Sequence, residues 1–270
     1  MKFDIHTHHY RCGHAEGNIR DYIESAISSG LQVIGISDHS PYFAKEEDMG
    51  NPGVAMGKSE MEGYVQEVLQ LKQEYAGTID VLLGMESDYF PDHVELYRNT
   101  FAKYPFDYII GSVHHVYEDS IFNKDQWIGL DSEQQLSIKK EYYRLIQGSA
   151  KSGLFQVLGH IDAMKGNYPG FSDIPAAETI DETLQVIASC GVAIEINTSG
   201  RMKLSGGWYP SDDILERALH YGVDVTFGSD SHHPNRIGDD FSKVSAKLRE
   251  IGFKEWVYYK QKQKQIVSLL

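Results

Sequence analysis

Near the start of the chain stands the stretch Phe3-Asp4-Ile5-His6-Thr7-His8, a short apolar segment that ends in two histidines one residue apart. Further short segments rich in Val and Ile follow it along the sequence. Most of them lack the alternation of apolar and polar residues that a half-exposed strand shows, which is typical of strands covered on both faces of a parallel sheet. The expected strands are Phe3–His6, Gln32–Ser37, Asp80–Gly84, Tyr108–Gly111, Gln156–Leu158, Val192–Ile196 and Asp224–Phe227.

Helical segments with recognisable start signals separate these strands. Ser59 with Glu62, and Ser132 with Gln135, have the spacing of a capping box, in which two side chains cap the first turn of a helix. Seven alternations of strand and helix indicate a parallel α/β architecture, and this number favours a closed barrel over an open sheet. We therefore expect a single α/β domain, similar to a barrel, over residues 1–270.

The composition excludes several classes of protein. The chain has 270 residues and a formal net charge of −14, which argues against a surface that binds nucleic acid. No apolar run approaches the roughly 20 residues that a membrane helix needs, so we expect no membrane partner. The two cysteines, Cys12 and Cys190, cannot form a disulfide framework, and a cytoplasmic location follows as the expectation. Nothing in the sequence fixes the oligomeric state.

Side chains that can bind metal follow almost every expected strand. Because barrel enzymes place their active sites at the C-terminal ends of the strands, these side chains are expected to meet there. Residues i and i+2 of an extended segment point the same way, so His6 and His8 can reach one ion, and the carboxylate of Glu86 can bridge two. The candidate ligands are His6, His8, His14, His39, Glu86, His114, His160, Asp230 and His232. Nine ligands exceed the three or four that one catalytic ion takes, so we expect at least two metals and favour three.

For the remaining histidines, a structural or surface role is the first interpretation. They are His9, His93, His115, His220 and His233. We interpret Cys12 as a small buried thiol that packs the loop, although a soft metal ligand remains an alternative.

The motifs that contain these residues form a series along the chain. They are Asp4-Ile5-His6-Thr7-His8, Cys12-Gly13-His14, Ser37-Asp38-His39, Gly84-Met85-Glu86-Ser87-Asp88-Tyr89, Gly111-Ser112-Val113-His114, Gly159-His160-Ile161-Asp162, Glu195-Ile196-Asn197-Thr198-Ser199-Gly200 and Gly228-Ser229-Asp230-Ser231-His232. The series resembles that of the polymerase-and-histidinol-phosphatase (PHP) superfamily, and most closely its stand-alone L-histidinol-phosphate phosphatases. The resemblance extends from residue 4 to about residue 240 and implies a distorted (β/α)7 barrel.

The resemblance also implies a site with three divalent transition-metal ions, which could be Zn, Fe or Mn. The first ion would be held by His6, His8, Glu86 and Asp230. Glu86 would bridge to a second ion on His114 and His160. The third ion would lie on His14, His39 and His232.

The expected reaction is hydrolysis of a small phosphate monoester, namely L-histidinol phosphate to L-histidinol and phosphate, in histidine biosynthesis. A hydroxide that bridges two ions would attack phosphorus, and Glu86 and Asp230 would be the catalytic ligands. Arg201 is the candidate phosphate clamp, because its planar guanidinium matches a phosphate, and Asn197 precedes it as a second candidate substrate contact. His115 is a candidate substrate contact and proton donor to the leaving group, and a metal-bound water is the alternative donor.

Other residues have more general expected roles. The carboxylates of Asp4, Asp38 and Asp162 could orient ligand imidazoles from behind. Loop position alone suggests that Tyr42, Phe43, Asp88 and Tyr89 contact the non-phosphate end of the substrate.

The sequence leaves other functions open. The loop His115-Val116-Tyr117-Glu118-Asp119 departs from the histidinol-phosphatase pattern and puts the leaving group in doubt. The alternatives are a nuclease or phosphodiesterase of the same superfamily, a protein-tyrosine phosphatase, and a non-catalytic metal-binding module. The acidic charge argues against a nuclease, and the complete set of nine ligands argues against a module without catalysis.

Overall fold

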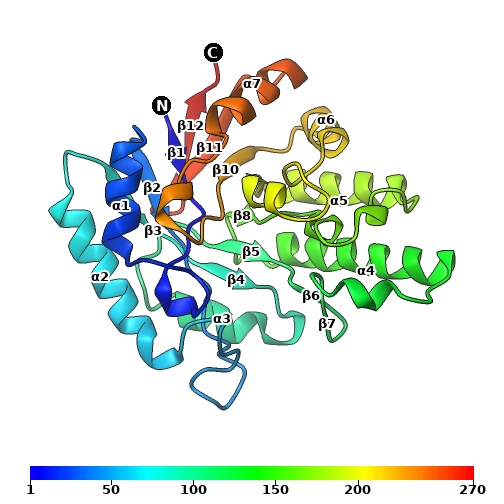
Figure 1. Cartoon of the computed structure of the whole chain (residues 1–270), viewed down its shortest axis with the longest axis horizontal. Helices are drawn as coiled ribbons and strands as arrows, with labels where there is room; N and C mark the ends of the chain where they lie inside the picture. The colour runs from blue at the N-terminus through cyan, green and yellow to red at the C-terminus, as the bar shows by residue number, and fades with distance from the viewer.

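Parallel strands form the centre of the molecule and helices surround them, as a computed structural model of residues 1–270 shows (Figure 1). A first sheet has the order β1-β2-β3, and a second has the order β10-β9-β8-β5-β4. Every strand pair within these two sheets is parallel. The strands are β1 (Phe3–Asp4), β2 (Val33–Ile36), β3 (Asp80–Leu83), β4 (Glu86–Asp88), β5 (Ile110–Ser112), β8 (Val157–Leu158), β9 (Ala193–Asn197) and β10 (Val225–Gly228). The predicted parallel α/β architecture is therefore confirmed.

The third expected strand divides between the two sheets. Its first part, β3, pairs with β2, whereas β4 pairs with β5 after a break at Gly84 and Met85. Isolated parallel bridges join the sheets at Thr7–Ser231 and at His39–Glu86. Because contact between the sheets is limited to such short stretches, the barrel is distorted.

Tyr108 fills the interior of this barrel. Its side chain is fully buried and its hydroxyl donates a hydrogen bond of 2.5 Å to the carbonyl of Ile5. A Cβ atom at Gly35 or Gly84 would collide with the Tyr108 ring or hydroxyl. Glycine at these two positions therefore lets the Tyr108 ring, just before β5, lie against the backbone of β2 and of the break between β3 and β4.

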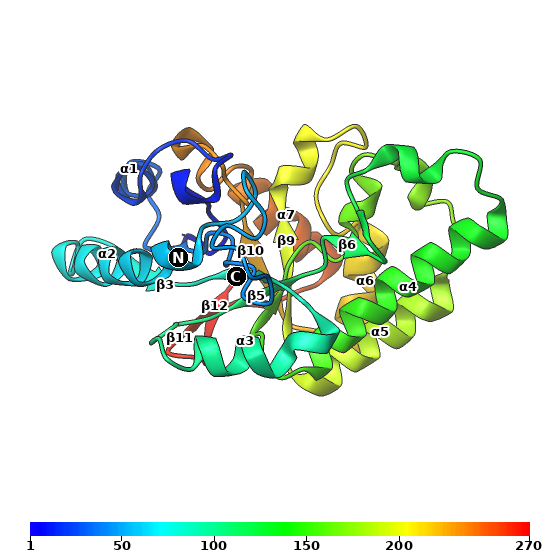
Figure 2. The same ribbon diagram turned by 90° about the horizontal axis from the view of Figure 1, so that it is seen from below.

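Seven α-helices flank the strands. Figures 1 and 2 place α1 and α2 on one side of the barrel, and α4 and α5 side by side on the opposite side. The helices are α1 (Ile19–Ser28), α2 (Met61–Glu74), α3 (Val94–Phe101), α4 (Ser132–Lys151), α5 (Ala177–Cys190), α6 (Asp212–Tyr221) and α7 (Phe241–Ile251). None of them combines the length and the apolar character that crossing a membrane requires.

The two predicted capping boxes are wrong in position. At α4 the box is formed by Asp131 and Gln134, one residue earlier than expected, because the Asp131 carboxylate accepts the free backbone N–H groups of the first turn. Before α2, Glu60 accepts the backbone N–H of Gly57. Ser59 lies inside the turn of 3-10 helix Lys58–Glu60, and its hydroxyl donates to Asp48.

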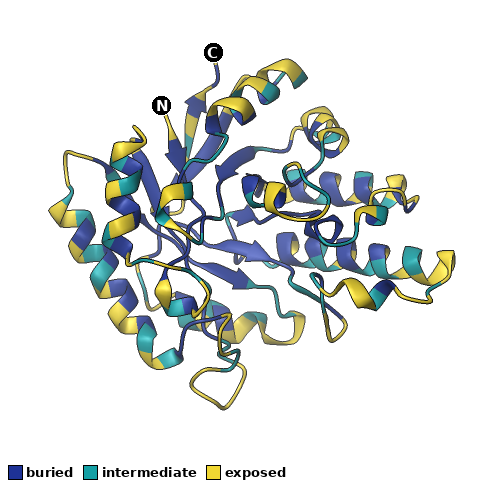
Figure 3. Ribbon diagram, viewed as in Figure 1, coloured by how far each residue is buried: buried dark blue, intermediate teal, exposed yellow.

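A C-terminal hairpin adds to the expected elements. It consists of the antiparallel strands β11 (Glu255–Lys260) and β12 (Gln263–Ser268). Trp256 of β11 packs its ring 5.0 Å from Phe3 and 4.7 Å from Phe241. A second small antiparallel pair, β6 (His115–Val116) and β7 (Asp119–Ser120), lies in the loop before α4. Buried residues occupy the strands and the inner faces of the helices, and exposed residues the outer faces (Figure 3).

Candidate metal centre

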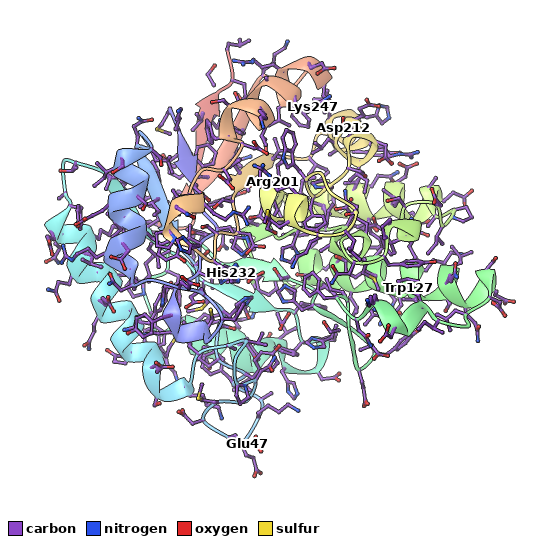
Figure 4. All side chains as sticks on the ribbon, viewed as in Figure 1. Glu47, Trp127, Arg201, Asp212, His232 and Lys247 are labelled. Carbon is purple, nitrogen blue, oxygen red and sulfur yellow. The ribbon has the colours of Figure 1, made fainter.

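The nine predicted ligands lie together near the C-terminal ends of the strands, with Glu86 in the segment that follows β3, and we call them the ligand cluster. Seven of them line a cavity of about 760 Å³. The other two, His6 and His8, are buried. Figure 4 places His232 near the centre of the molecule in that view.

Glu86, at the start of β4, is the central residue of the ligand cluster. Its Oε2 atom lies 3.5 Å from His6 Nε2, 3.6 Å from His8 Nε2 and 2.8 Å from His39 Nδ1. Its other oxygen, Oε1, lies 3.5 Å from His114 Nε2 and 3.1 Å from His160 Nε2. The two oxygens thus face two separate groups of imidazoles, the arrangement of a carboxylate that bridges two ions.

Asp230 completes the group around His6 and His8. Its Oδ1 atom lies 3.0 Å from His8 Nε2 and 3.8 Å from His6 Nε2. Two ligand atoms of a tetrahedral zinc ion with bonds near 2.1 Å are separated by about 3.4 Å. The observed separations around Glu86 and Asp230 lie on both sides of that spacing, from 2.8 Å to 3.8 Å.

A third group of imidazoles lies at the mouth of the cavity. His14 Nε2 and His232 Nε2 approach to 2.8 Å, and the ring of His39 lies 5.3 Å from that of His14. Nitrogen atoms of His8, His39 and His232 also lie within 4.8 Å of one another. The group that could hold an ion therefore contains His8 where the implied third set has His14, and the third set stays a prediction.

Unpaired polar atoms in the ligand cluster show that its residues fit metal ions. His6 Nε2, His8 Nε2 and Glu86 Oε2 are buried and have no well-aligned hydrogen-bond partner, although His39 Nδ1 lies 2.8 Å from Glu86 Oε2 and Asp230 Oδ1 lies 3.0 Å from His8 Nε2. Buried polar atoms in proteins are nearly always paired, and a cation would supply the missing partner for all three.

The charge state of the carboxylates suits this role. Burial alone would raise the pKa of Glu86, but the surrounding imidazoles, first His39 and then His6, hold it well below its usual value. Burial would likewise raise the pKa of Asp230, but the imidazoles, first His6, hold it well below its usual value. Both side chains are therefore anionic, as metal ligands must be.

Carboxylates behind the ligands orient three of the imidazoles. Asp38 Oδ1 lies 3.2 Å from His8 Nδ1, as predicted. Glu195 Oε1 lies 2.6 Å from His6 Nδ1. Asp88 Oδ1 lies 2.8 Å from His114 Nδ1. Such partners fix the orientation of a ligand ring.

Sequence reasoning missed Glu195 as a partner of this kind. Its signal is a single acidic residue between Ile194 and Ile196, in the middle of a fully buried strand. A buried carboxylate in an apolar strand needs a partner, so this residue could have been found.

Asp4 and Asp162 do not orient imidazoles, contrary to expectation. Asp4 accepts the backbone N–H groups of Ser229 and Gly238, both at 2.9 Å. Asp162 accepts the backbone N–H of Ser211 at 2.9 Å and pairs with Lys165 at 2.7 Å. Both carboxylates stabilise the loops that carry the site.

The structure corrects the predicted substrate contact of Asn197. This side chain is fully buried and does not line the cavity. Its Nδ2 donates to Glu195 at 2.9 Å and to Asp230 at 3.3 Å, and its Oδ1 accepts the backbone N–H of Ser199. Asn197 thus holds a ligand in place.

Arg201, the predicted phosphate clamp, does not line the cavity in this structure. Its Nη1 lies 3.1 Å from Asp240 Oδ2, and the side chain is 42% exposed. Figure 4 labels Arg201 apart from His232. The cations that line the cavity are Lys203 and Arg236, which sequence reasoning did not single out although they follow β9 and β10 as the ligands do.

The other predicted substrate contacts divide into two groups. His115 and Tyr42 line the cavity, and the Tyr42 hydroxyl donates to Asp88 at 2.6 Å. Phe43 and Tyr89 pack against the hydrophobic core instead.

The residues with expected structural roles lie mainly outside the cavity. His9 is buried, and His93 and His220 are exposed. His233 lines the cavity and lies 3.4 Å from Glu16. The thiol of Cys12 is buried and donates to the His9 carbonyl, as a packing residue would.

Comparison with known proteins agrees with this geometry. The chain is 31% identical to a probable histidinol-phosphatase of Deinococcus radiodurans, over 92% of this chain and 93% of that protein. It is 28% identical to the histidinol-phosphatase of Bacillus subtilis, over 88% of this chain and 96% of that protein. The histidinol phosphate phosphatase of Lactococcus lactis, solved in complex with zinc, L-histidinol and phosphate, has the same fold, with a TM-score of 0.81, 22% identity and coverage of 98% of each chain. A family model described as the PHP domain matches residues 4–199, and this chain belongs to the PHP domain family.

Proposed function

We propose that this protein is a metal-dependent phosphatase that hydrolyses L-histidinol phosphate to L-histidinol and phosphate. Relatives that align over nearly the whole chain are named histidinol-phosphatase. The solved relative from Lactococcus lactis was captured with zinc, L-histidinol and phosphate. The reaction belongs to histidine biosynthesis, and we place it in the cytoplasm, in one catalytic domain over residues 1–270.

The observation that carries this proposal is the position of Glu86. One fully buried carboxylate faces imidazoles on both of its oxygens, and most of these imidazoles also line the cavity. A structural ion is enclosed by its ligands, whereas a catalytic centre keeps an open side for substrate. The ligand cluster opens to a cavity of about 760 Å³, which supports a catalytic centre.

Three divalent ions, which could be Zn, Fe or Mn, would be held by the sets implied above. The first would lie on His6, His8, Glu86 and Asp230, the second on Glu86, His114 and His160, and the third on His14, His39 and His232. When bound, such ions supply positive charge for the phosphoryl oxygens and make a water molecule acidic enough to attack phosphorus.

The side chains around the cavity would bind the rest of the substrate. Lys203 and Arg236 line the cavity and add positive charge near the phosphate. We retain Arg201 as the phosphate clamp, which requires its guanidinium to exchange Asp240 for the substrate. His115, half-buried in the cavity wall, lies where it could bind the substrate and protonate the leaving oxygen.

A substrate panel combined with metal analysis tests the proposal. The panel contains histidinol phosphate, p-nitrophenyl phosphate, a bis-ester, a short oligonucleotide and a phosphotyrosine peptide. Histidinol phosphate is expected to give the highest kcat/KM, in protein that carries two to three equivalents of metal and loses activity with chelator. Preferred cleavage of the oligonucleotide or bis-ester would establish a phosphodiesterase instead, and preference for the peptide a protein-tyrosine phosphatase. Active protein with one equivalent or fewer would contradict the three-metal centre.

A further inference from the structure

Behind the predicted ligand His8, the carboxylate of Asp38 lies between the imidazoles of His8 and His9. Asp38 Oδ1 lies 3.2 Å from His8 Nδ1, and Asp38 Oδ2 lies 3.1 Å from His9 Nδ1. All three side chains are buried, with exposed fractions of 1% or less. The sequence alone suggests only a structural or surface role for His9.

The two oxygens of Asp38 are held unequally. Oδ1 accepts the backbone N–H of His39 at 2.8 Å in addition to facing His8. Oδ2 is buried and has no well-aligned hydrogen-bond partner, and His9 Nδ1 is the imidazole nitrogen that approaches it. A small rotation of either side chain would give Oδ2 the donor that a buried carboxylate requires.

The proton of His9 is best placed on Nδ1. The backbone N–H of Arg11 also approaches this nitrogen, but at 3.5 Å, which is the long limit of a hydrogen bond. The other nitrogen, Nε2, is buried without a partner. A proton on Nε2 would leave a buried N–H and a buried carboxylate oxygen unpaired and would set the Nδ1 lone pair against that anion at 3.1 Å. A proton on Nδ1 leaves the Nε2 acceptor unpaired and gives up the long contact from the Arg11 N–H, and it supplies a charge-assisted hydrogen bond in exchange.

We infer that His9 is a positioning residue of the metal centre. Its Nδ1–H holds Asp38, and Asp38 holds the ring of His8. The Nε2 atom of His8 is then directed at Asp230 Oδ1 and Glu86 Oε2, at 3.0 and 3.6 Å. The inference rests on the metal centre proposed above, and it adds a residue that acts on the metal through two others.

A packing role makes a different prediction. The His9 ring stacks on that of Tyr64, with 5.4 Å between centroids and 30° between planes. If packing were the whole role, the aromatic ring of His9→Phe would replace it. His9→Asn does the opposite, because it loses the ring and keeps an amide N–H close to the position of Nδ1.

The experiment measures Zn²⁺ affinity of the chelator-stripped full-length protein by competition with a chromophoric chelator. His9→Phe is expected to weaken zinc binding about tenfold, the scale of losses behind metal ligands, while His9→Asn stays within about threefold of the wild-type protein. The surface substitution His220→Asn is the control, because His220 is exposed on α6. The substrate is absent, so the result does not depend on which phosphate ester the enzyme cleaves.

Two outcomes would overturn the inference. Wild-type zinc affinity in His9→Phe would show that the ring alone is sufficient. An equal loss in His9→Phe and His9→Asn would show that the Nδ1 donor is irrelevant. If His9→Phe does not fold, His9→Gln replaces it, because its amide nitrogen lies near the position of Nε2 and cannot reach Asp38. Wild-type affinity in His9→Gln would then reject the inference.

Discussion

Nδ1 of His6 lies 2.6 Å from Oε1 of Glu195, and neither side chain has any exposed surface. The second oxygen of Glu195 accepts the backbone N–H of His160 at 3.2 Å and the side-chain amide of Asn197 at 2.9 Å. One carboxylate in β9 therefore holds a ligand side chain after β1 and the backbone of a ligand after β8. The strands and the ligand cluster are linked through it.

Glu195→Gln tests this link. The substitution keeps the size of the side chain but removes the charge that faces His6, so zinc affinity is expected to fall about 10–100-fold. Chelator competition on the purified protein measures the loss, and Glu216→Gln on the exposed face of α6 is the matched control. An affinity equal to that of the wild-type protein would show that the orientation of His6 does not depend on this charge.

Glu86→Gln and Asp230→Asn test the ligands themselves. Each substitution removes a negative charge that is expected to contact metal directly, so kcat should fall by at least about a thousandfold, beyond the 10–100-fold typical of residues behind the ligands. Steady-state kinetics and elemental analysis are measured on the same samples. A variant that retains a tenth of the wild-type rate at full metal loading would show that its residue is not a ligand.

Metal binding is expected to strengthen as the pH rises from 7 to 9. Burial lowers the pKa of His8, but Asp230 and Asp38 outweigh it and raise the pKa to about 9 in the metal-free protein. Burial also lowers the pKa of His114, but the carboxylate of Asp88 outweighs it, and the pKa of His114 is raised to about 9. Both imidazoles are therefore protonated at pH 7, and a metal ion must displace these protons because it binds the neutral ring.

Proton release and affinity measure this effect together. Zinc added to stripped protein in weak buffer at pH 7 should release protons, and the apparent affinity should rise by about tenfold per pH unit for each proton released. The release should fall to about half at pH 9, where each imidazole is half protonated, and decline further above it. An affinity that is constant between pH 7 and 9 would show that these imidazoles are already neutral without metal.

The position of the ligand cluster could be predicted because it depends on the strands alone. The C-terminal ends of parallel strands meet at one end of a barrel, so residues that follow them, such as His8 and His114, come together whatever the details of packing. No tertiary contact has to be known for this step. The same holds for the fold, since the repeated alternation of strand and helix already indicates parallel strands.

The contacts behind the ligands could not be predicted in this way. Glu195 is 189 residues from His6 in the chain, and only the register of the strands brings them together. Asn197 ends its strand, close to where the ligands stand, yet the tertiary structure buries it against Asp230. The exact start of α4 depends on which of two adjacent polar residues, Asp131 or Ser132, reaches the free N–H groups. Such choices are made by packing.

The last prediction concerns Arg201, which the structure pairs with Asp240 at the N-terminal end of α7. Asp240 also lies 2.7 Å from Lys243 and accepts a hydrogen bond from Trp208, so it keeps other partners when the arginine leaves. The two glycines that follow in the loop, Gly206 and Gly207, both have positive φ, at 62° and 75°. A substrate phosphate could therefore take the guanidinium from Asp240 without leaving that carboxylate unpaired.

If Arg201 is the clamp, Arg201→Ala should leave folding and metal content intact. It should lower kcat/KM by roughly 10²–10³, because the phosphate would lose a charge-assisted hydrogen bond in a low-dielectric site. Inhibition by inorganic phosphate should weaken in parallel, and Arg201→Lys should recover only part of the activity because lysine lacks the planar fork. Asp240→Asn should strengthen phosphate inhibition, since it removes the competing anion. Arg236→Ala is the comparison, because Arg236 already lines the cavity but lies 3.0 Å from Asp239. Unchanged kinetics in Arg201→Ala together with a large decrease in Arg236→Ala would assign the clamp to Arg236.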